Sequence, residues 1–399
     1  MLTPAEADAR IAAHLSTLPV EGRPLGRCVG AVLREDLFAE RDSPPFDRVA
    51  MDGVALQSDA VQRGVRRFHL EATQAAGDPA RTLASDAACI EVMTGAVLPV
   101  GCDAVVPVEQ ITTTDAKVEL AADLGVAAWA NVHRRGTDAR QGDLLLSAGT
   151  RLSAPEVAIA ASSGRASLPV SRPPSIAVIS TGNELVEPGA PILDHQIRRS
   201  NVYAVMGALQ QHGFHEVVDD HVLDDAGALR DRLEAHLHDR DVLILSGGVS
   251  MGRFDLVPEA LADLGVEVVF HKVAQRPGKP LWFGVAPSGT AVFALPGNPV
   301  STVICLVRYV LPALFAAMGQ RPPAPETIAL AEAVTIDRPL TLFVPVVVDH
   351  DDRGQAWARP APTNGSGDLT SLGGTDGFVE LPAGPGTFPP GTVTRRYRW

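Results

Sequence analysis

The sequence predicts a multidomain protein that combines an α/β domain with β-rich domains. Its 399 residues correspond to two to four domains of roughly 150 residues each. Short apolar runs separated by Gly, Asp and Pro fill residues 21–174, and a regular rhythm of strand, loop and helix begins at residue 175. The 36 glycines and 32 prolines imply many turns, which favours strands and α/β units over a helical bundle.

The first predicted element is a helix over residues 4–18. Its apolar residues recur at helical spacing and include Ile11, Leu15 and Leu18. Thr3 precedes it as an N-cap, and Pro4 suits the first helical position.

In the β-rich stretch, residues 104–109 and 117–120 predict short strands. The run Ser-Arg-Pro-Pro-Ser at 171–175 predicts a linker, and the Pro-rich run at 319–325 predicts a second one. A strand-rich tail of about seventy residues follows the second linker.

Between the linkers, apolar runs predict strands at 176–179, 216–223, 241–245, 266–273 and 292–295. Helical patterns are found at 201–211, 226–237 and 256–264, and a long helix follows 296–299. Buried strands that alternate with helices predict a parallel sheet with helices on both faces.

The overall charge excludes some classes of partner. The net charge of −13 argues against non-specific binding to nucleic acid or to acidic lipid, both of which need basic patches.

The four cysteines form no CxxC pair, which fits a reducing cytosol. The N-terminus has no apolar run typical of a signal peptide. The apolar segment 301–318 contains Arg308 and Pro312, so it predicts a buried helix rather than a membrane span.

Chemistry-bearing loops follow the predicted strands, at the edge of the sheet where such folds bind ligands. Gly247, Gly248 and Gly252 let the backbone approach a ligand, and exposed amides there can bind phosphate. Asp255 is either an N-cap or a Mg²⁺ ligand beside a phosphate. Further carboxylates for this edge come from Glu184 and Asp224, each of which is otherwise a solvated loop acid.

Cations gather close to these acids. The chain has only three lysines, and two of them, Lys272 and Lys279, flank Arg276. Cations and acids together suit an anionic, metal-bound ligand. Asn298 followed by Pro299 is the pattern of an N-cap and a first helical residue, which opens another helix N-terminus toward the same edge.

The β-rich half carries three further candidate segments. They are residues 44–56 with Asp47 and Asp52, residues 93–106 with Thr94, and residues 131–143 with His133 and Asp138. Each segment alone is equally well explained as an ordinary turn.

Eight motifs that follow one another along the chain resemble those of a known protein family. They are PPFDRVAMDGVA, MTGAVLPVGCDAVVPVE, RRGTD, ISTGNEL, IRRSNVYAV, LILSGGVSMGRFD, RPGKPLWFG and ALPGNPVS. Together they resemble the molybdopterin molybdenumtransferase family, which includes bacterial MoeA and the E domains of gephyrin and its plant counterpart. The resemblance spans nearly the whole chain.

The resemblance implies an elongated subunit of four domains that acts as a homodimer. Residues 1–20 and 175–320 would form a three-layer α/β domain similar to the molybdopterin-adenylyltransferase fold. Residues 21–42 and 143–174 would form a connecting domain, and 43–142 a β-rich domain that faces the partner subunit's site. The tail, 325–399, would be a β-barrel-like domain.

The resemblance also implies a function in molybdenum cofactor biosynthesis. The family inserts molybdate into the dithiolene of adenylylated molybdopterin and releases AMP, with Mg²⁺ as the cation. A cytoplasmic location and a transient contact with molybdopterin adenylyltransferase are implied as well, without nucleic acid or membrane partners.

Site residues are carried over from the family by position. The implied catalytic residues are Asp52, Thr94, Asp138, Glu184, Asp224, Asp255 and Lys272. The implied substrate-binding residues are Gly247, Gly248, Ser250, Gly252, Arg276, Lys279, Pro280, Pro296, Asn298, Pro299 and Ser366. The implied metal ligands are Asp255, Asp224 and Glu184.

Three positions depart from the family pattern. Arg276 stands where Lys is frequent, which exchanges a point charge for a planar fork. His133 stands where Arg is common, which would make one positive charge depend on pH. Pro345 stands where the tail usually has Arg, so the tail's share in anion binding is left open.

Two other functions compete with molybdate insertion. Adenylylation of molybdopterin would require only the α/β domain, so residues 43–142 and the tail argue against it. A receptor scaffold, as in gephyrin, would not need the complete set of site acids. This chain also lacks the long linker and extra domain of such fusions.

Overall fold

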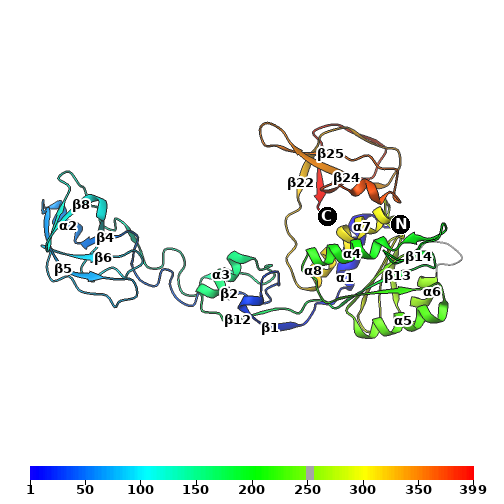
Figure 1. Ribbon diagram of the computed structural model, residues 1–399, viewed down its shortest axis with the longest axis horizontal. Helices are drawn as coiled ribbons and strands as arrows, with labels where there is room; N and C mark the ends of the chain where they lie inside the picture. Colours follow the sequence, from blue (N-terminus) through cyan, green and yellow to red (C-terminus); the bar gives the residue numbers. More distant parts are fainter. Residues whose placement is uncertain (249–255) are drawn as a thin grey trace. The chain divides into compact units, whose positions relative to one another are not determined.

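The computed structural model describes residues 1–248 and 256–399. The chain forms two compact units. The large unit contains Met1–Glu35, Ala148–Ser153 and Ser167–Trp399, and the small unit contains Asp36–Ser147 and Ala154–Ala166. Figure 1 shows the elements of each unit. The residues expected to form a connecting domain, 21–42 and 143–174, are divided between the two units.

A six-stranded sheet is the centre of the large unit. Its strands lie in the order β16 (Val217–Val222), β13 (Ile176–Thr181), β17 (Val242–Ser246), β21 (Ala291–Leu295), β20 (Trp282–Val285) and β18 (Glu267–His271). The prediction of a parallel sheet is confirmed for the first four strands. One strand departs from it: β20, which the sequence pattern did not predict as a strand, pairs antiparallel with both β21 and β18, so the edge strand β18 runs parallel to the first four. The link between β20 and β21, residues 286–290, is too short for a crossover helix.

Helices cover both faces of this sheet, as predicted. One face packs against α1 (Pro4–His14), α4 (Ser200–Gln211), α7 (Pro299–Cys305) and α8 (Leu311–Ala317). The other face packs against α5 (Ala226–Asp239) and α6 (Leu256–Asp263). Ile176 and Val178 of β13 belong to the first core, and Ala177 and Ile179 belong to the second. Because both faces of the strand are buried, its sequence is a continuous apolar run.

The helix at the N-terminus begins as predicted and ends early. Thr3 caps α1, and Glu6 completes a capping box with it. The helix stops at His14 rather than at residue 18. Leu18 is nevertheless buried, and its amide donates to the carbonyl of Ala317 at 2.8 Å.

The apolar segment near residue 300 is a core helix. Helix α7, a π-helical segment (Leu306–Val310) and α8 form one helix of 19 residues, Pro299–Ala317, and 78% of its most apolar 18-residue stretch is buried. It is long and apolar enough to cross a membrane by length and composition alone. The burial of its side chains inside the large unit accounts for that composition.

The tail forms a closed barrel, which confirms the predicted architecture. Its strands are β22 (Thr327–Leu330), β23 (Val334–Ile336), β24 (Thr341–His350), β25 (Ala356–Pro360), β26 (Gly377–Leu381), β27 (Gly386–Phe388) and β28 (Val393–Tyr397). The order β24, β25, β22, β28 and β26 closes through the pairing of β26 with β24. A short strand from the α/β region, β19 (Gln275–Arg276), pairs parallel with β24.

The small unit contains a second six-stranded sheet. Its strands lie in the order β7 (Ala104–Pro107), β4 (Gly53–Leu56), β6 (Ala88–Val92), β5 (Arg67–Gln74), β9 (Lys117–Leu120) and β8 (Ile111–Thr114). A Cβ on Gly53 would lie 2.0 Å from the carbonyl oxygen of Val106, so only glycine fits where β4 meets β7.

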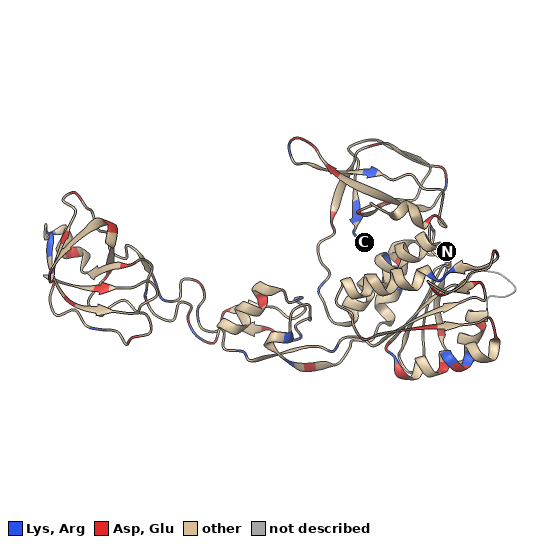
Figure 2. Cartoon of the chain, in the orientation of Figure 1, with Lys and Arg blue, Asp and Glu red and all other residues tan. Residues whose placement is uncertain are grey.

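Short elements complete both units. The small unit adds α2 (Ser58–Gln62), α3 (Ala154–Ser162) and the strand pairs β2 (Leu37–Phe38) with β11 (Leu144–Leu146) and β3 (Arg48–Val49) with β10 (Val132–His133). The large unit adds the pairs β1 (Val20–Pro24) with β12 (Ser167–Ser171) and β14 (Leu185–Val186) with β15 (Ile197–Arg198). Figure 2 shows basic residues interspersed with acidic ones over both units.

Candidate functional site

Glycines bring the ends of three parallel strands together. The amide of Gly247, just after β17, donates to the carbonyl of Leu295 at the end of β21 at 3.3 Å. A Cβ on Gly297 would lie 3.7 Å from the Cα of Gly247, and a Cβ on Gly248 would lie 2.9 Å from the Thr181 hydroxyl at the end of β13. Gly247 and Gly248 both have positive φ, +99° and +66°. Gly247, Gly248 and Gly297, here called the glycine cradle, therefore let the three strand ends approach one another closely.

Asn201, which sequence reasoning did not single out, supports the glycine cradle through hydrogen bonds of its side chain. Its side-chain amide donates to the Ser246 hydroxyl at 2.9 Å and to the Gly297 carbonyl at 2.8 Å. Within residues 1–248 and 256–399, the Asn201 Oδ1 and Thr181 Oγ1 atoms are buried without a hydrogen-bond partner. Asn201 falls in the IRRSNVYAV motif, so the motif pointed to it although no role could be assigned to it.

Two predicted carboxylates flank one turn beside the cradle. The amide of Asn183 donates to the Asp224 carboxylate at 3.3 Å, and the amide of Asp224 donates to the Asn183 side chain at 3.1 Å. The Glu184 carboxylate lies 2.6 Å from the position that a Cβ on Gly182 would take. The structure therefore holds the loops after β13 and β16 together, as their place at adjacent strand ends predicts.

The donor set at this turn fits Mg²⁺ in type, because Mg²⁺ takes one or two carboxylates together with phosphate oxygens. Among the described residues, no group of three or more His, Cys, Asp or Glu side chains could hold a metal ion. A site of protein ligands alone is therefore not formed by them. Three predicted residues, Ser250, Gly252 and Asp255, lie outside the described residues.

The loop of residues 272–280, here called the cationic loop, is held by its backbone and leaves two of its three basic residues exposed. Lys272 has a positive φ of +75°, and its amide donates to the Leu281 carbonyl at 2.9 Å. The amide of Val273 donates to the Lys279 carbonyl at 2.9 Å. A Cβ on Gly278 would lie 2.6 Å from the Cys305 sulfur, so the loop is packed directly against the core helix. Arg276 and Lys279 are exposed in this loop.

A cavity of about 950 Å³ is lined both by this loop and by the barrel. The predicted residues that line it are Arg276, Lys279, Pro280, Pro296, Asn298 and Ser366. Barrel residues that sequence reasoning did not assign also line it, among them Thr335, Arg338, Thr363 and Asn364. Lys272 is not one of the lining residues. Sequence reasoning left the tail's part open, and the structure places the tail in the wall of this cavity.

Asn298 takes a different part from the predicted one. Helix α7 begins at Pro299 with Asn298 at the N-cap position, as predicted, but its side chain makes no capping hydrogen bond. Instead, the side-chain amide of Asn298 donates to the Ser366 hydroxyl at 2.9 Å. The backbone amide of Val300 donates to the Ser366 carbonyl at 3.1 Å. A carbonyl from the barrel thus satisfies a free amide of the first helical turn, which a side chain usually does.

The remaining predicted residues lie in the small unit. The backbone amide and the hydroxyl of Thr94 both donate to Asp52 at 2.6 Å, and these bonds hold the pKa of Asp52 below its usual value. His133 contacts Asp138 through Nε2 at 2.8 Å and Arg48 through Nδ1 at 3.0 Å. The structure thus pairs Asp52 with Thr94 and Asp138 with His133.

Comparisons with known proteins agree over the whole length. Three family models match, the MoeA N-terminal region (domains I and II) at residues 2–164, a probable molybdopterin binding domain at 177–316, and the MoeA C-terminal region (domain IV) at 327–395. A molybdopterin molybdenumtransferase of Synechocystis sp. is 40% identical over 386 residues, which cover 96% of this chain and 95% of the relative. One from Bacillus subtilis is 31% identical over 362 residues, or 88% of this chain and 83% of the relative.

Solved structures agree with this result. The crystal structure of a molybdopterin biosynthesis MoeA protein from Pyrococcus horikoshii matches with a TM-score of 0.81 and 28% identity, and the match covers 100% of this chain and 99% of that one. Sequence and architecture therefore both place this chain in the molybdopterin molybdenumtransferase family.

Proposed function

We propose that this chain inserts molybdate into the dithiolene of adenylylated molybdopterin and releases AMP in the course of molybdenum cofactor biosynthesis. One observation carries the proposal beyond family membership. A glycine cradle at three strand ends lies in the same unit as an exposed pair of cations that line a cavity of about 950 Å³. Backbone amides suit phosphate, and fixed cations suit a second anion, so the site matches a substrate with both.

Each part of this chemistry has predicted residues that would carry it. Gly247 and Gly248 would receive the phosphates of the adenylylated pterin, and Arg276 and Lys279 would hold molybdate with Ser366. Glu184 and Asp224 would hold Mg²⁺, with Asp255 added by its position in the family motif. When bound, Mg²⁺ would neutralise charge on the phosphates during cleavage.

We further propose a cytoplasmic homodimer whose partners are these substrates, without nucleic acid or membrane. Asp52, Thr94 and Asp138 belong to the small unit, yet they match functional positions of the family. They would serve the α/β site of the partner subunit. A transient contact with molybdopterin adenylyltransferase would deliver the adenylylated substrate.

The direct test is to mix the protein with adenylylated molybdopterin, Mg²⁺ and molybdate, and to measure AMP. Absence of molybdate-dependent AMP release would reject the proposed reaction. Activity on ATP and free molybdopterin, with AMP-pterin as the product, would instead assign the chain to adenylylation.

Asp224→Asn is expected to lower AMP release by about ten-fold, because the amide keeps the size of the side chain and loses the charge that binds Mg²⁺. The measurement is the rate of AMP release as a function of Mg²⁺ concentration. The matched control is Asp225→Asn, because Asp225 caps α5 by accepting from Ala228 at 2.8 Å and Asn caps a helix equally well. Equal rates in the two variants would remove Asp224 from the metal site.

A mixture of Asp52→Ala and Asp224→Ala subunits is expected to recover about a quarter of the parent activity. Random exchange makes about half of the dimers mixed, and each mixed dimer would hold one intact site out of two. Native mass spectrometry would confirm the exchange. Activity no higher than that of the single variants, with exchange complete, would place the whole site within one chain.

A further inference from the structure

A buried arginine fixes the segment that carries Glu184. Residues 182–199, here called the arm, connect β13 to α4 and include the paired strands β14 and β15. Arg199 is the last residue of the arm, and it is only 4% exposed. Its guanidinium donates to the Ser180 hydroxyl of β13 at 2.6 Å, and to the Asp219 carboxylate and the Asp220 carbonyl of β16 at 3.0 and 2.8 Å.

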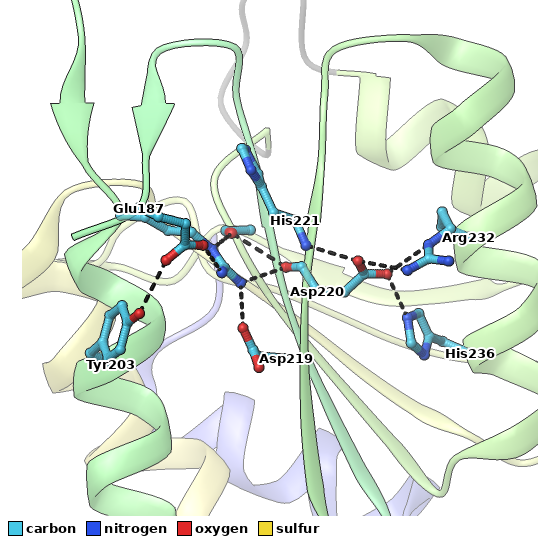
Figure 3. A network of polar contacts seen from close by, with 9 residues as sticks. Glu187, Tyr203, Asp219, Asp220, His221, Arg232 and His236 are labelled. Atoms are coloured by element: carbon cyan, nitrogen blue, oxygen red, sulfur yellow. Dashed lines mark hydrogen bonds and ion pairs between the residues drawn. The ribbon is translucent and has the colours of Figure 1, made fainter. Parts of the chain in front are cut away.

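The same guanidinium also binds a side chain of the arm itself. It forms a hydrogen-bonded ion pair with Glu187, whose other carboxylate oxygen accepts from the Tyr203 hydroxyl at 3.0 Å. Figure 3 shows Glu187 between Tyr203 and the acids of the edge strand. The contact with Arg199 holds the pKa of Glu187 below its usual value. One buried cation therefore joins two strands of the sheet to an otherwise peripheral segment.

The network reaches the proposed metal ligands at both ends of the arm. At its start, the His221 ring contacts the Gly182 carbonyl at 3.0 Å, next to the turn shared by Asn183 and Asp224. At its end, the amide of Ile197 donates to the Glu184 carbonyl at 2.9 Å, and the amide of Arg199 donates to the Val186 carbonyl at 3.0 Å. Glu184 is thus tied to the backbone immediately beside Arg199.

We propose that Arg199 is a positioning residue, which fixes the arm on the sheet and thereby holds Glu184 next to the turn that Asn183 shares with Asp224. The inference rests on the proposed function, in which these two carboxylates bind Mg²⁺. A buried ionic cluster is often no more stable than apolar side chains of the same volume. An arginine that orders four partners from three segments contributes geometry that apolar packing would not.

The test uses two variants that leave most of the cluster in place. Glu187→Gln removes the carboxylate charge that pairs with Arg199, and the Glu187 side chain is 47% exposed, so the fold should tolerate the change. Arg199→Lys keeps the charge, but a single ammonium cannot reproduce the contacts of the planar fork. The matched control is Arg232→Met, because Arg232 pairs with Asp220 from helix α5 (Figure 3) and does not contact the arm in any hydrogen bond or ion pair of the described residues.

Both arm variants are expected to raise the Mg²⁺ concentration for half-maximal AMP release by about three- to ten-fold, the size of one lost charge-assisted contact. The rate at saturating Mg²⁺ should stay within about two-fold of the parent, because the reacting groups themselves are unchanged. Hydrogen exchange should become faster at the amides of Ile197 and Arg199. Arg232→Met should leave the Mg²⁺ dependence and both amides as in the parent.

Three outcomes would overturn the proposal. They are an unchanged Mg²⁺ dependence in both arm variants, unchanged exchange at the two amides, or an equal effect of Arg232→Met. Failure of the proposed function would look different, since the parent itself would then release no AMP. In that case the exchange rates would still decide whether Arg199 fixes the arm, with faster exchange supporting it and unchanged exchange excluding it.

Discussion

Lys279→Ala is expected to raise the molybdate concentration needed for half-maximal product formation by about ten- to a hundred-fold. Well-placed charge-assisted contacts are worth about 1.5–3 kcal/mol, and 1.4 kcal/mol corresponds to a factor of ten. Lys279 lines the cavity, and its side chain makes no hydrogen bond or ion pair within residues 1–248 and 256–399. Its charge is therefore available to an anion, in a chain whose net charge of −13 repels anions at long range.

The melting temperature of Lys279→Ala should change little, because the loop is held by the Lys279 carbonyl rather than by its side chain. Lys117→Ala is the matched control, since Lys117 is exposed on β9 of the small unit. A molybdate titration beside a melting curve checks both variants. An unchanged titration would remove Lys279 from the anion site. A large fall in melting temperature would show instead that the side chain supports the loop.

Arg308→Met is expected to lower the free energy of unfolding of the large unit by about 3 kcal/mol. Removing one partner of a buried ion pair leaves uncompensated charge behind and costs about 3–5 kcal/mol. The Arg308 side chain is 5% exposed, and it donates to Asp8 of α1 at 2.8 and 2.9 Å and to Glu380 of β26 at 3.1 Å. The lower end of the range applies because the Asp8 side chain is 45% exposed.

Calorimetric unfolding would measure this loss. Arg398→Met is the matched control, because Arg398 pairs with Glu326 in the same unit with side chains 64% and 50% exposed, and it should cost less than about 1 kcal/mol. The triple variant R308M/D8N/E380Q should regain most of the loss, since no buried charge remains unpaired. If the two single variants unfolded alike, the Arg308 cluster would contribute no more than a surface pair does.

The sequence by itself determined the elements whose signals are local. Thr3 before Pro4 marks the start of α1, and Asn298 before Pro299 marks the start of α7. Continuous apolar runs identified the strands that are buried on both faces, because such strands leave no position for a polar residue. The same strands placed most candidate residues, since the carboxyl ends of parallel strands share one edge.

Resemblance extended this reading to the small unit. Asp52 and Thr94 are far apart in sequence, and no periodicity connects them, yet they contact one another at 2.6 Å. Only the order of motifs characteristic of the family suggested that they act together. The antiparallel strand β20 was predicted by neither route, because its four residues were not recognised as a strand and a strand does not record in its sequence the direction in which it pairs.

The tertiary structure alone decided which side chains complete the site. Barrel closure brings Ser366 onto Asn298 and joins β19 to β24, so residues about seventy positions apart enclose one cavity. Asn201 and Arg199 belong to a recognisable motif. Their roles depend on hydrogen-bond partners that are distant in sequence, such as Gly297 for Asn201 and Asp219 for Arg199. The physical reason is that periodicity and capping act over a few residues, whereas burial of a guanidinium or an amide depends on partners that only long-range packing supplies.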